Sequence, residues 1–419
     1  MALCRCVRLC TNWCEWFDAL RWYDGSFSTI HSTYYWNYLE SSFSVDDNRS
    51  NPRSPGVKFR CEREVLNEAF TAASNAASNR GTNPTLSCLR LVLAGDTLRV
   101  TGTDGDLTID SSITVSAGKD GVVLVPGKLA ADIVKNLPSG AVDFRVVEDK
   151  VEISAGRSNF TMPIGVGDDF PKWSGTVGEG APMAAKDFAE GLKQVNRAAS
   201  TDEARGVYTG VYMTGVDGKL RMVATDSYRM AIRDIDASVI PDGKSVVVPA
   251  RALKELQRLL EKQERVSMNI TDNDVTFEAG SVRLVTRLLT GSFADYQRLI
   301  PANLPNTLTV SRESLAEAIR RVKLVARDPI GTPLRMHVTS SDVTLRMITP
   351  DNGEAFEQID ASHQGNDIEI RFNNELLSQG LDACGTDDVT IQTSDPSKLA
   401  VIKGVGQDNF TYLLMPLKS

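Results

Sequence analysis

The chain has 419 residues, of which 42% are hydrophobic and 24% are charged, a composition typical of a globular protein with enough apolar material for several domains. It contains no run of about 18 apolar residues, so the sequence predicts no membrane-spanning helix and no membrane partner. The formal net charge of −8 argues against a protein that is basic over its whole surface, but it leaves room for one local basic surface that binds a polyanion.

The first 56 residues differ from the rest of the chain. They hold four of the five tryptophans, four of the nine tyrosines and four of the seven cysteines, and they show no helical or strand period. The cysteine spacing at 4–14 fits no standard zinc site, and no apolar signal-peptide core follows it. We interpret residues 1–56 as a leader that is disordered or arises from the choice of start codon, with Val57 as the true first residue. A mass of the native protein that includes residue 1 would contradict the start-codon interpretation.

The other three cysteines are Cys61, Cys88 and Cys384, scattered along the chain without metal-binding spacing. Reduced thiols of this kind are usual in cytoplasmic proteins. We therefore expect a cytoplasmic protein whose cysteines are buried and unpaired.

From residue 58 onward, one pattern occurs three times at a period of about 120 residues, which is far longer than the 20–50 residues of a solenoid repeat. Pro126, Pro249 and Phe372 mark equivalent places in the three copies, and Asp104 corresponds to Asp226. Each copy contains two segments that read as a strand leading into a helix, which indicates a whole domain in triplicate. These segments are 59–78 and 123–138, 183–200 and 246–261, and 308–326 and 368–385.

The repeat predicts an α+β fold. Alternating segments such as 122–125 and 283–286 read as strands, and the two helices of each copy are expected to cover one side of the sheets. Connectors rich in Gly, Pro or Asn fall near 174–182 and 301–306. We place the three domains at 57–176, 177–304 and 305–419.

Positive charge collects on one face of four of the six predicted helices. In 250–262, for example, the leucines share one face while the arginines and lysines share the opposite face. An ordinary solvated helix face is the alternative, since acidic residues occur on the same faces. We predict that these helices form a local basic surface that contacts nucleic-acid phosphates without reading the bases. The predicted DNA-binding residues are Lys128, Lys135, Lys193, Arg197, Arg251, Lys254, Arg258, Arg320, Lys323 and Arg327.

Catalytic signatures are missing from the sequence. It has no Walker loop, no H-E-x-x-H and no G-x-S-x-G, and its glycine pairs lack the third glycine of a dinucleotide site, so we predict no catalytic residue, metal or cofactor. The acidic pairs at 104–106 and 272–274 read as turns between strands. Two alternatives stay open. One is a nuclease that uses Asp104, Asp106 and Asp110, and the other is an interaction scaffold built on the same fold.

Several stretches carry a resemblance to a known family. They are KFRCERE at 58–64, TGTD at 101–104, GRSNF at 156–160, VATDSYRM at 223–230 and YLLMPLKS at 412–419. Over residues 58–419 the chain resembles the bacterial DNA sliding clamp, the β subunit of DNA polymerase III. The resemblance implies a homodimer of three-domain protomers that forms a six-domain ring, with sheets outside and helices inside. Such a ring encircles double-stranded DNA, tethers the replicative polymerase and has no catalytic activity of its own.

The resemblance also implies a pocket on the second and third domains for short linear motifs of the DNA polymerase III α subunit and of clamp-loader subunits. The apolar C-terminus supports a docking role, because chain ends are usually polar and loose; a final strand with an apolar tail is the alternative. The matching positions are Tyr208, Thr225, Tyr228, Arg229, Met230, Arg298, Leu299, Leu413, Met415, Pro416 and Leu417.

Overall fold

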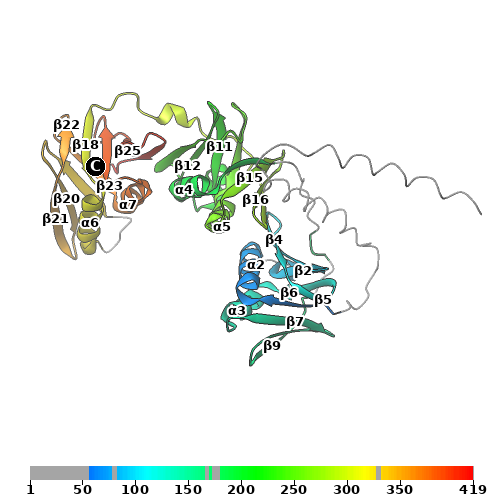
Figure 1. The fold of residues 1–419 in the computed structure, drawn as a ribbon. Coiled ribbons are helices and arrows are strands. Elements are labelled where there is room, and N and C mark those ends of the chain that lie inside the picture. Colours follow the sequence, from blue (N-terminus) through cyan, green and yellow to red (C-terminus); the bar gives the residue numbers. More distant parts are fainter. Residues whose placement is uncertain (1–55, 78–82, 166–168, 172–179, 327–331, 419) are drawn as a thin grey trace, which may run out of the picture. The chain divides into compact units, whose positions relative to one another are not determined.

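The computed structural model describes residues 56–77, 83–165, 169–171, 180–326 and 332–418. The predicted leader, apart from its last residue, and Arg327 lie outside these residues. Among the described helices, none has the length and apolar character needed to cross a membrane. The described chain forms three α+β domains in tandem, which confirms the predicted fold class (Figure 1).

The first domain has two sheets and a pair of packed helices. Its core includes Phe59 and Phe144, whose stacked ring centroids lie 4.6 Å apart. The helices begin where the predicted strand–helix segments place them, because their apolar residues face this core. The elements are β1 (Lys58–Glu62), α2 (Arg63–Ala76), a 3₁₀ turn (Pro84–Ser87), β2 (Cys88–Ala94), β3 (Thr97–Thr103), β4 (Leu107–Thr114), β5 (Ser116–Lys119), β6 (Gly121–Pro126), α3 (Gly127–Asn136), β7 (Ala141–Val147), β8 (Lys150–Ala155) and β9 (Ser158–Pro163).

The second domain repeats this order. Phe188 and Phe277 pack at its centre with ring centroids 5.8 Å apart. Its elements are β10 (Ala181–Ala184), α4 (Ala185–Val195), 3₁₀ turns at Asn196–Ala198 and Glu203–Thr209, β11 (Gly210–Val216), β12 (Lys219–Thr225), β13 (Arg229–Ile235), β14 (Ser245–Pro249), α5 (Ala250–Leu260), β15 (Arg265–Ile270), β16 (Asp274–Ala279) and β17 (Val282–Arg287), followed by a 3₁₀ turn at Tyr296–Leu299.

The third domain follows the same plan, and side chains cap both of its helices. Ser311 accepts a hydrogen bond from the Ser314 amide, and Asn373 accepts from the amides of Glu375 and Leu376, which satisfies amide groups that a helix start leaves unpaired. The elements are β18 (Asn306–Ser311), α6 (Arg312–Val322), a 3₁₀ turn (Lys323–Val325), β19 (Pro333–Val338), β20 (Asp342–Thr349), β21 (Gly353–Asp360), β22 (Ser362–Gln364), β23 (Ile368–Asn373), α7 (Asn374–Ala383), β24 (Asp388–Thr393), β25 (Ala400–Gly404) and β26 (Phe410–Leu414).

Two sheets continue across the domain boundaries. Antiparallel pairing of β17 with β4, in which Leu284 lies opposite Ile109, joins the second domain to the first in one eight-stranded sheet. Pairing of β26 with β13, in which Leu413 lies opposite Met230, joins the third domain to the second in a nine-stranded sheet. The domains are therefore joined by backbone hydrogen bonds as well as by connectors.

Two of the predicted helices end earlier than expected. Helix α4 ends at Val195 and continues as a 3₁₀ turn, and α6 ends at Val322 in the same way. The Asn196 side chain donates a hydrogen bond to the Ala250 carbonyl at the start of α5, 3.0 Å away, which turns the chain out of the helix. A contact between the two helical segments of the second domain, which the helical periodicity of either segment alone does not reveal, therefore sets this boundary.

Candidate functional site

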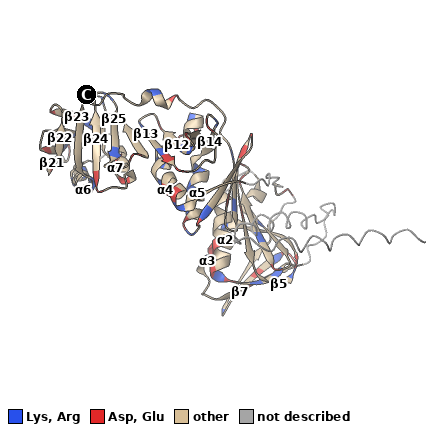
Figure 2. Ribbon diagram, turned by 45° about the horizontal axis from the view of Figure 1, so that its top comes forward, with Lys and Arg blue, Asp and Glu red and all other residues tan. Residues whose placement is uncertain are grey.

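The cations predicted to bind DNA lie on helices or at helix ends. All nine described cations are exposed except Lys323, which is half-buried, while apolar residues on the same helices are buried, as Leu253 and Leu256 are. Basic and acidic residues occur together along these helices (Figure 2). The nine are Lys128 and Lys135 on α3, Lys193 on α4, Arg251, Lys254 and Arg258 on α5, Arg320 on α6, and Arg197 and Lys323 in the 3₁₀ turns.

Carboxylates of the chain itself pair with five of these nine cations, which the sequence analysis did not predict. In the pairs of Arg197, Arg320 and Lys323 both partners are at least partly exposed. Exposed ion pairs are weak, about 0–1 kcal/mol, so a phosphate can replace such a carboxylate at small cost. The other four cations are lysines that form no ion pair within the described part of the chain. The pairs are Arg197–Asp382 (3.7 Å), Arg251–Asp104 (2.6 Å), Arg258–Glu255 (2.7 Å), Arg320–Glu317 (3.8 Å) and Lys323–Glu375 (2.7 Å).

The acidic pair at 104–106 forms the predicted turn, between β3 and β4. One oxygen of Asp104 accepts hydrogen bonds from the amides of Asp106 and Leu107, at 3.0 and 2.8 Å. Its other oxygen pairs with Arg251 of the second domain. Asp110, the third carboxylate of the nuclease alternative, is 1% exposed and accepts a 2.7 Å hydrogen bond from Arg99. These carboxylates are used in the fold, and the nuclease alternative loses its support.

The loop between β12 and β13 brings several predicted pocket residues next to the C-terminal strand. Tyr228 is 59% exposed, and its carbonyl accepts a 2.8 Å hydrogen bond from the amide of Met415, itself 41% exposed. Beneath them, Met230 and Leu413 are buried in a small apolar cluster with Tyr296. The structure thus places residues from two domains side by side.

The other predicted pocket residues lie in several different elements. Leu299 is 49% exposed in the 3₁₀ turn at 296–299, where Arg298 pairs with Asp295 at 2.8 Å. The amide of Leu417, which follows Pro416, donates to the Arg371 carbonyl at 2.7 Å, so the C-terminal tail lies along the third domain. The Tyr208 ring packs near Phe293, with centroids 5.6 Å apart, and the buried Thr225 donates to the Arg229 carbonyl at 2.6 Å.

Arg229 has its guanidinium between the domains. Its side chain is 9% exposed, and it pairs with Asp226 at 3.0 Å. It also donates to the Gln379 side chain, to the Arg197 carbonyl and to the Tyr412 hydroxyl. Burial raises the pKa of the Tyr412 phenol to about 12. The charged end of Arg229 is therefore committed to contacts within the chain.

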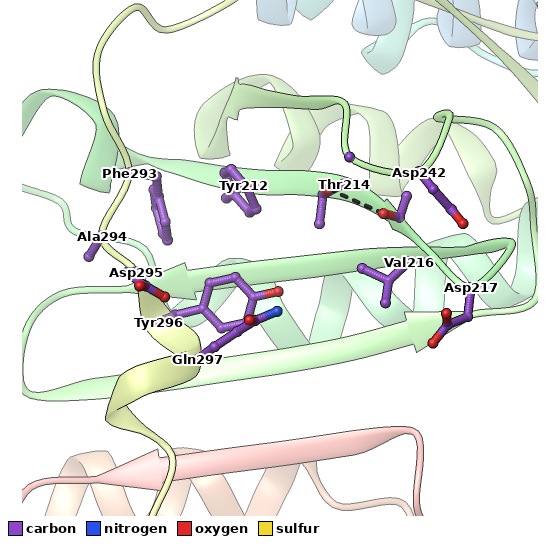
Figure 3. Close-up of a pocket in the computed structure, with 12 residues that line it drawn as sticks. Tyr212, Thr214, Val216, Asp217, Asp242, Phe293, Ala294, Asp295, Tyr296 and Gln297 are labelled. Atoms are coloured by element: carbon purple, nitrogen blue, oxygen red, sulfur yellow. Dashed lines mark hydrogen bonds between the residues drawn. The ribbon is translucent and has the colours of Figure 1, made fainter.

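A cavity of about 510 Å³ lies on the second domain, where the segment 293–297 passes over β11 (Figure 3). The Tyr212 ring stacks on Phe293 with centroids 5.0 Å apart, and Tyr296 packs against it at 6.0 Å. Asp217 and Asp242 lie together at the opposite end of the cavity. This hollow was not predicted from the sequence, where its local signal is the aromatic pair Phe293 and Tyr296 ahead of the connector at 301–306.

Comparisons with known proteins cover the chain from residue 57. The central domain of the DNA polymerase III beta subunit matches residues 183–295, the N-terminal domain matches 57–174 and the C-terminal domain matches 297–418. The beta sliding clamp of Staphylococcus aureus is 28% identical over 375 residues, which is 87% of this chain and 100% of the relative.

Solved structures agree with these matches. The sliding clamp of Pseudomonas aeruginosa bound to griselimycin has a TM-score of 0.81 at 28% identity, over 87% of this chain and 100% of that one. The Bartonella birtlesii clamp bound to griselimycin has a TM-score of 0.82 at 28% identity over the same shares. This chain belongs to the bacterial beta sliding clamps, the non-catalytic DNA polymerase III subunits that make DNA synthesis processive.

Proposed function

We propose that two copies of the chain join head to tail into a closed six-domain ring around duplex DNA in the cytoplasm. Support comes from a type of strand pairing that joins neighbouring domains and occurs twice within the chain. Strands β4, β13 and β21 hold the same place in their domains, and so do β9, β17 and β26. Within the chain, β17 pairs with β4 and β26 pairs with β13, while β9 and β21 are edge strands. Pairing of β21 with β9 of a second copy would form the same kind of contact between domains and close the ring.

Exposed apolar side chains on these two edges support the same interface. Phe160 on β9 is 40% exposed, and Phe356 on β21 is 68% exposed. In the same two domains, Leu129 on α3 is 47% exposed and Leu324 after α6 is 82% exposed. An open strand edge with large apolar side chains is prone to pair with another chain, so its coverage in a homodimer is physically expected.

We propose that the helix cations listed above contact DNA phosphates inside this ring. Lysine and arginine on helix faces bind phosphate without base contacts, so such binding is independent of sequence and sensitive to salt. The internal ion pairs weaken the phosphate contacts of five of these cations, which suits a protein that slides. Topology, not affinity, would then keep the ring on the DNA.

We further propose that the Tyr228–Met415 region and its neighbours bind linear motifs of the polymerase α subunit and of the clamp loader. The support is an exposed, partly apolar surface at the junction of two domains, built on a buried cluster that holds its shape. Because two relatives have been solved with griselimycin bound, we propose that this chain binds that compound as well.

Retention on circular DNA tests the ring. The protein is loaded onto nicked circular DNA with its cognate clamp loader and ATP, gel-filtered in high salt, and the DNA is then linearised. We expect the protein to stay on the circle and to leave after the cut, which demonstrates a topological link. Protein that washes off both forms alike would be bound by charge alone and would contradict the ring.

A double substitution tests the pocket. We expect Met415→Ala with Leu417→Ala to abolish binding of a fluorescein-labelled peptide that carries the clamp-binding motif of the cognate polymerase, because apolar contact area is lost. The dimer and its melting temperature should not change. Val405→Ala is the matched control, since Val405 is 47% exposed and lies in a turn outside the proposed pocket. Unchanged peptide affinity in the double variant would refute the assignment.

A further inference from the structure

A continuous chain of hydrogen bonds crosses the boundary between the second and third domains. Arg229 donates to the side-chain oxygen of Gln379 on α7. The amide nitrogen of Gln379 donates to one oxygen of Glu375, at 3.1 Å, and Lys323 donates to the other oxygen, at 2.7 Å. The pKa of the Glu375 carboxyl is lowered, first by the Lys323 hydrogen bond, then by Gln379, and further by the charge of Arg229. These groups respond to one another electrostatically as well as by contact.

One end of this chain of hydrogen bonds lies in the loop between β12 and β13, which belongs to the proposed partner pocket. Asp226 accepts hydrogen bonds from the amides of Tyr228 and Arg229, both at 3.0 Å. Ser227 has a φ of 75°, a backbone conformation that is costly for a residue with a side chain. A partner peptide that packs on exposed Tyr228 therefore acts on a strained loop whose next residue is Arg229.

At the other end, this chain of hydrogen bonds reaches two of the proposed DNA-contacting cations. Lys323 is bound through Glu375, and Arg229 also donates directly to the backbone carbonyl of Arg197. Both cations lie in 3₁₀ turns at the ends of α6 and α4. A short turn is held by few backbone hydrogen bonds, so its position depends on such outside contacts.

We infer that Arg229 is a positioning residue that couples the partner pocket to the DNA-facing cation Lys323. The inference rests on the proposed function of both surfaces. A phosphate that takes Lys323 from Glu375 leaves that carboxylate to Gln379 and Arg229, which tightens the hold on Arg229 and orders the loop. An ordered loop binds a peptide with less loss of conformational freedom. DNA in the ring thus strengthens peptide binding, and by linkage the peptide strengthens binding to DNA.

The experiment compares the peptide Kd of free protein with that of protein loaded on nicked circular DNA. The probe is the fluorescein-labelled polymerase peptide, read by fluorescence anisotropy. We expect the peptide to bind about fivefold more tightly to the loaded wild-type ring, at the lower end of usual coupling factors. Glu375→Gln, which keeps the shape but removes the charge, and Lys323→Ala should bring the ratio close to one. Lys323→Arg should restore it.

Glu317→Gln is the matched control, because Glu317 pairs with Arg320 and Arg321 on α6 and has no link to Arg229. It should keep the wild-type ratio. Equal peptide Kd values for free and loaded wild-type protein, or an undiminished ratio in Glu375→Gln, would overturn the coupling. Failure to load on the circle, or failure of the peptide to bind either form, would instead contradict the proposed function. Residue 375 is about half exposed, so the substitution is compatible with folding, and a thermal melt of each variant checks this.

Discussion

Replacing Phe356 by alanine should weaken the proposed dimer strongly without disturbing the protomer. The Phe356 side chain is 68% exposed on β21 when the chain is alone. Complete burial of a phenylalanine contributes about 1.5–3 kcal/mol, so the exposed part is worth about 1–2 kcal/mol at one interface. A ring of two protomers contains this contact twice, which gives roughly 2–4 kcal/mol for the dimer. The dimer Kd should therefore rise roughly 30- to 700-fold.

Sedimentation equilibrium of wild type and variant measures this change. Val405→Ala is the control, since it shortens another exposed apolar side chain that lies on neither edge strand. The melting temperature of the Phe356→Ala protomer should stay close to that of wild type, because the side chain contributes little to the protomer core. A dimer Kd unchanged within about threefold, which corresponds to less than 1 kcal/mol, would refute the pairing of β21 with β9.

Three further predictions concern the fold. Gly380→Ala should destabilise the protein by about 1–3 kcal/mol in urea unfolding, because the added carbon would lie 2.5 Å from the buried Tyr412 ring. Asp104→Ala should cost about 1–2 kcal/mol in the same assay, since Asp104 supports its turn and an ion pair across the domain boundary; an unchanged midpoint would contradict this role. The pKa of Glu375 is lowered from 4.5 by Lys323, so its stabilising effect is present above pH 4.5 and is lost as the pH falls through the lowered value. Urea unfolding between about pH 5 and pH 3 should show this loss in wild type and a smaller loss in Glu375→Gln.

Most of the fold could be predicted from the local periodicity of apolar residues in the sequence. Apolar residues at helical spacing can be recognised within a single segment. The buried face of α5 and the two strand–helix units of each domain could therefore be predicted without knowing what they pack against. The turn at Asp104 was predictable for the same reason, because aspartate forms it with its own neighbouring amides.

Contacts between repeats were not predictable in this way. The ion pair of Arg251 with Asp104 joins residues of different domains, and no local pattern in either segment specifies the other. The orientation of Arg229 depends on Gln379, which a motif within residues 223–230 does not contain. Sequence reasoning therefore identified which residues are charged and exposed, but not which of them are already partnered.

The sheet that joins β13 to β26 has a consequence for biosynthesis. Strand β26 (Phe410–Leu414) is the last described strand of the third domain, so the second domain keeps an open β13 edge until the strands of the third domain have been synthesised. Such an edge can pair with the edge of another nascent chain. Premature termination of translation before β26 would leave a protomer with this edge exposed, and that product should be a preferred substrate for chaperones and proteases.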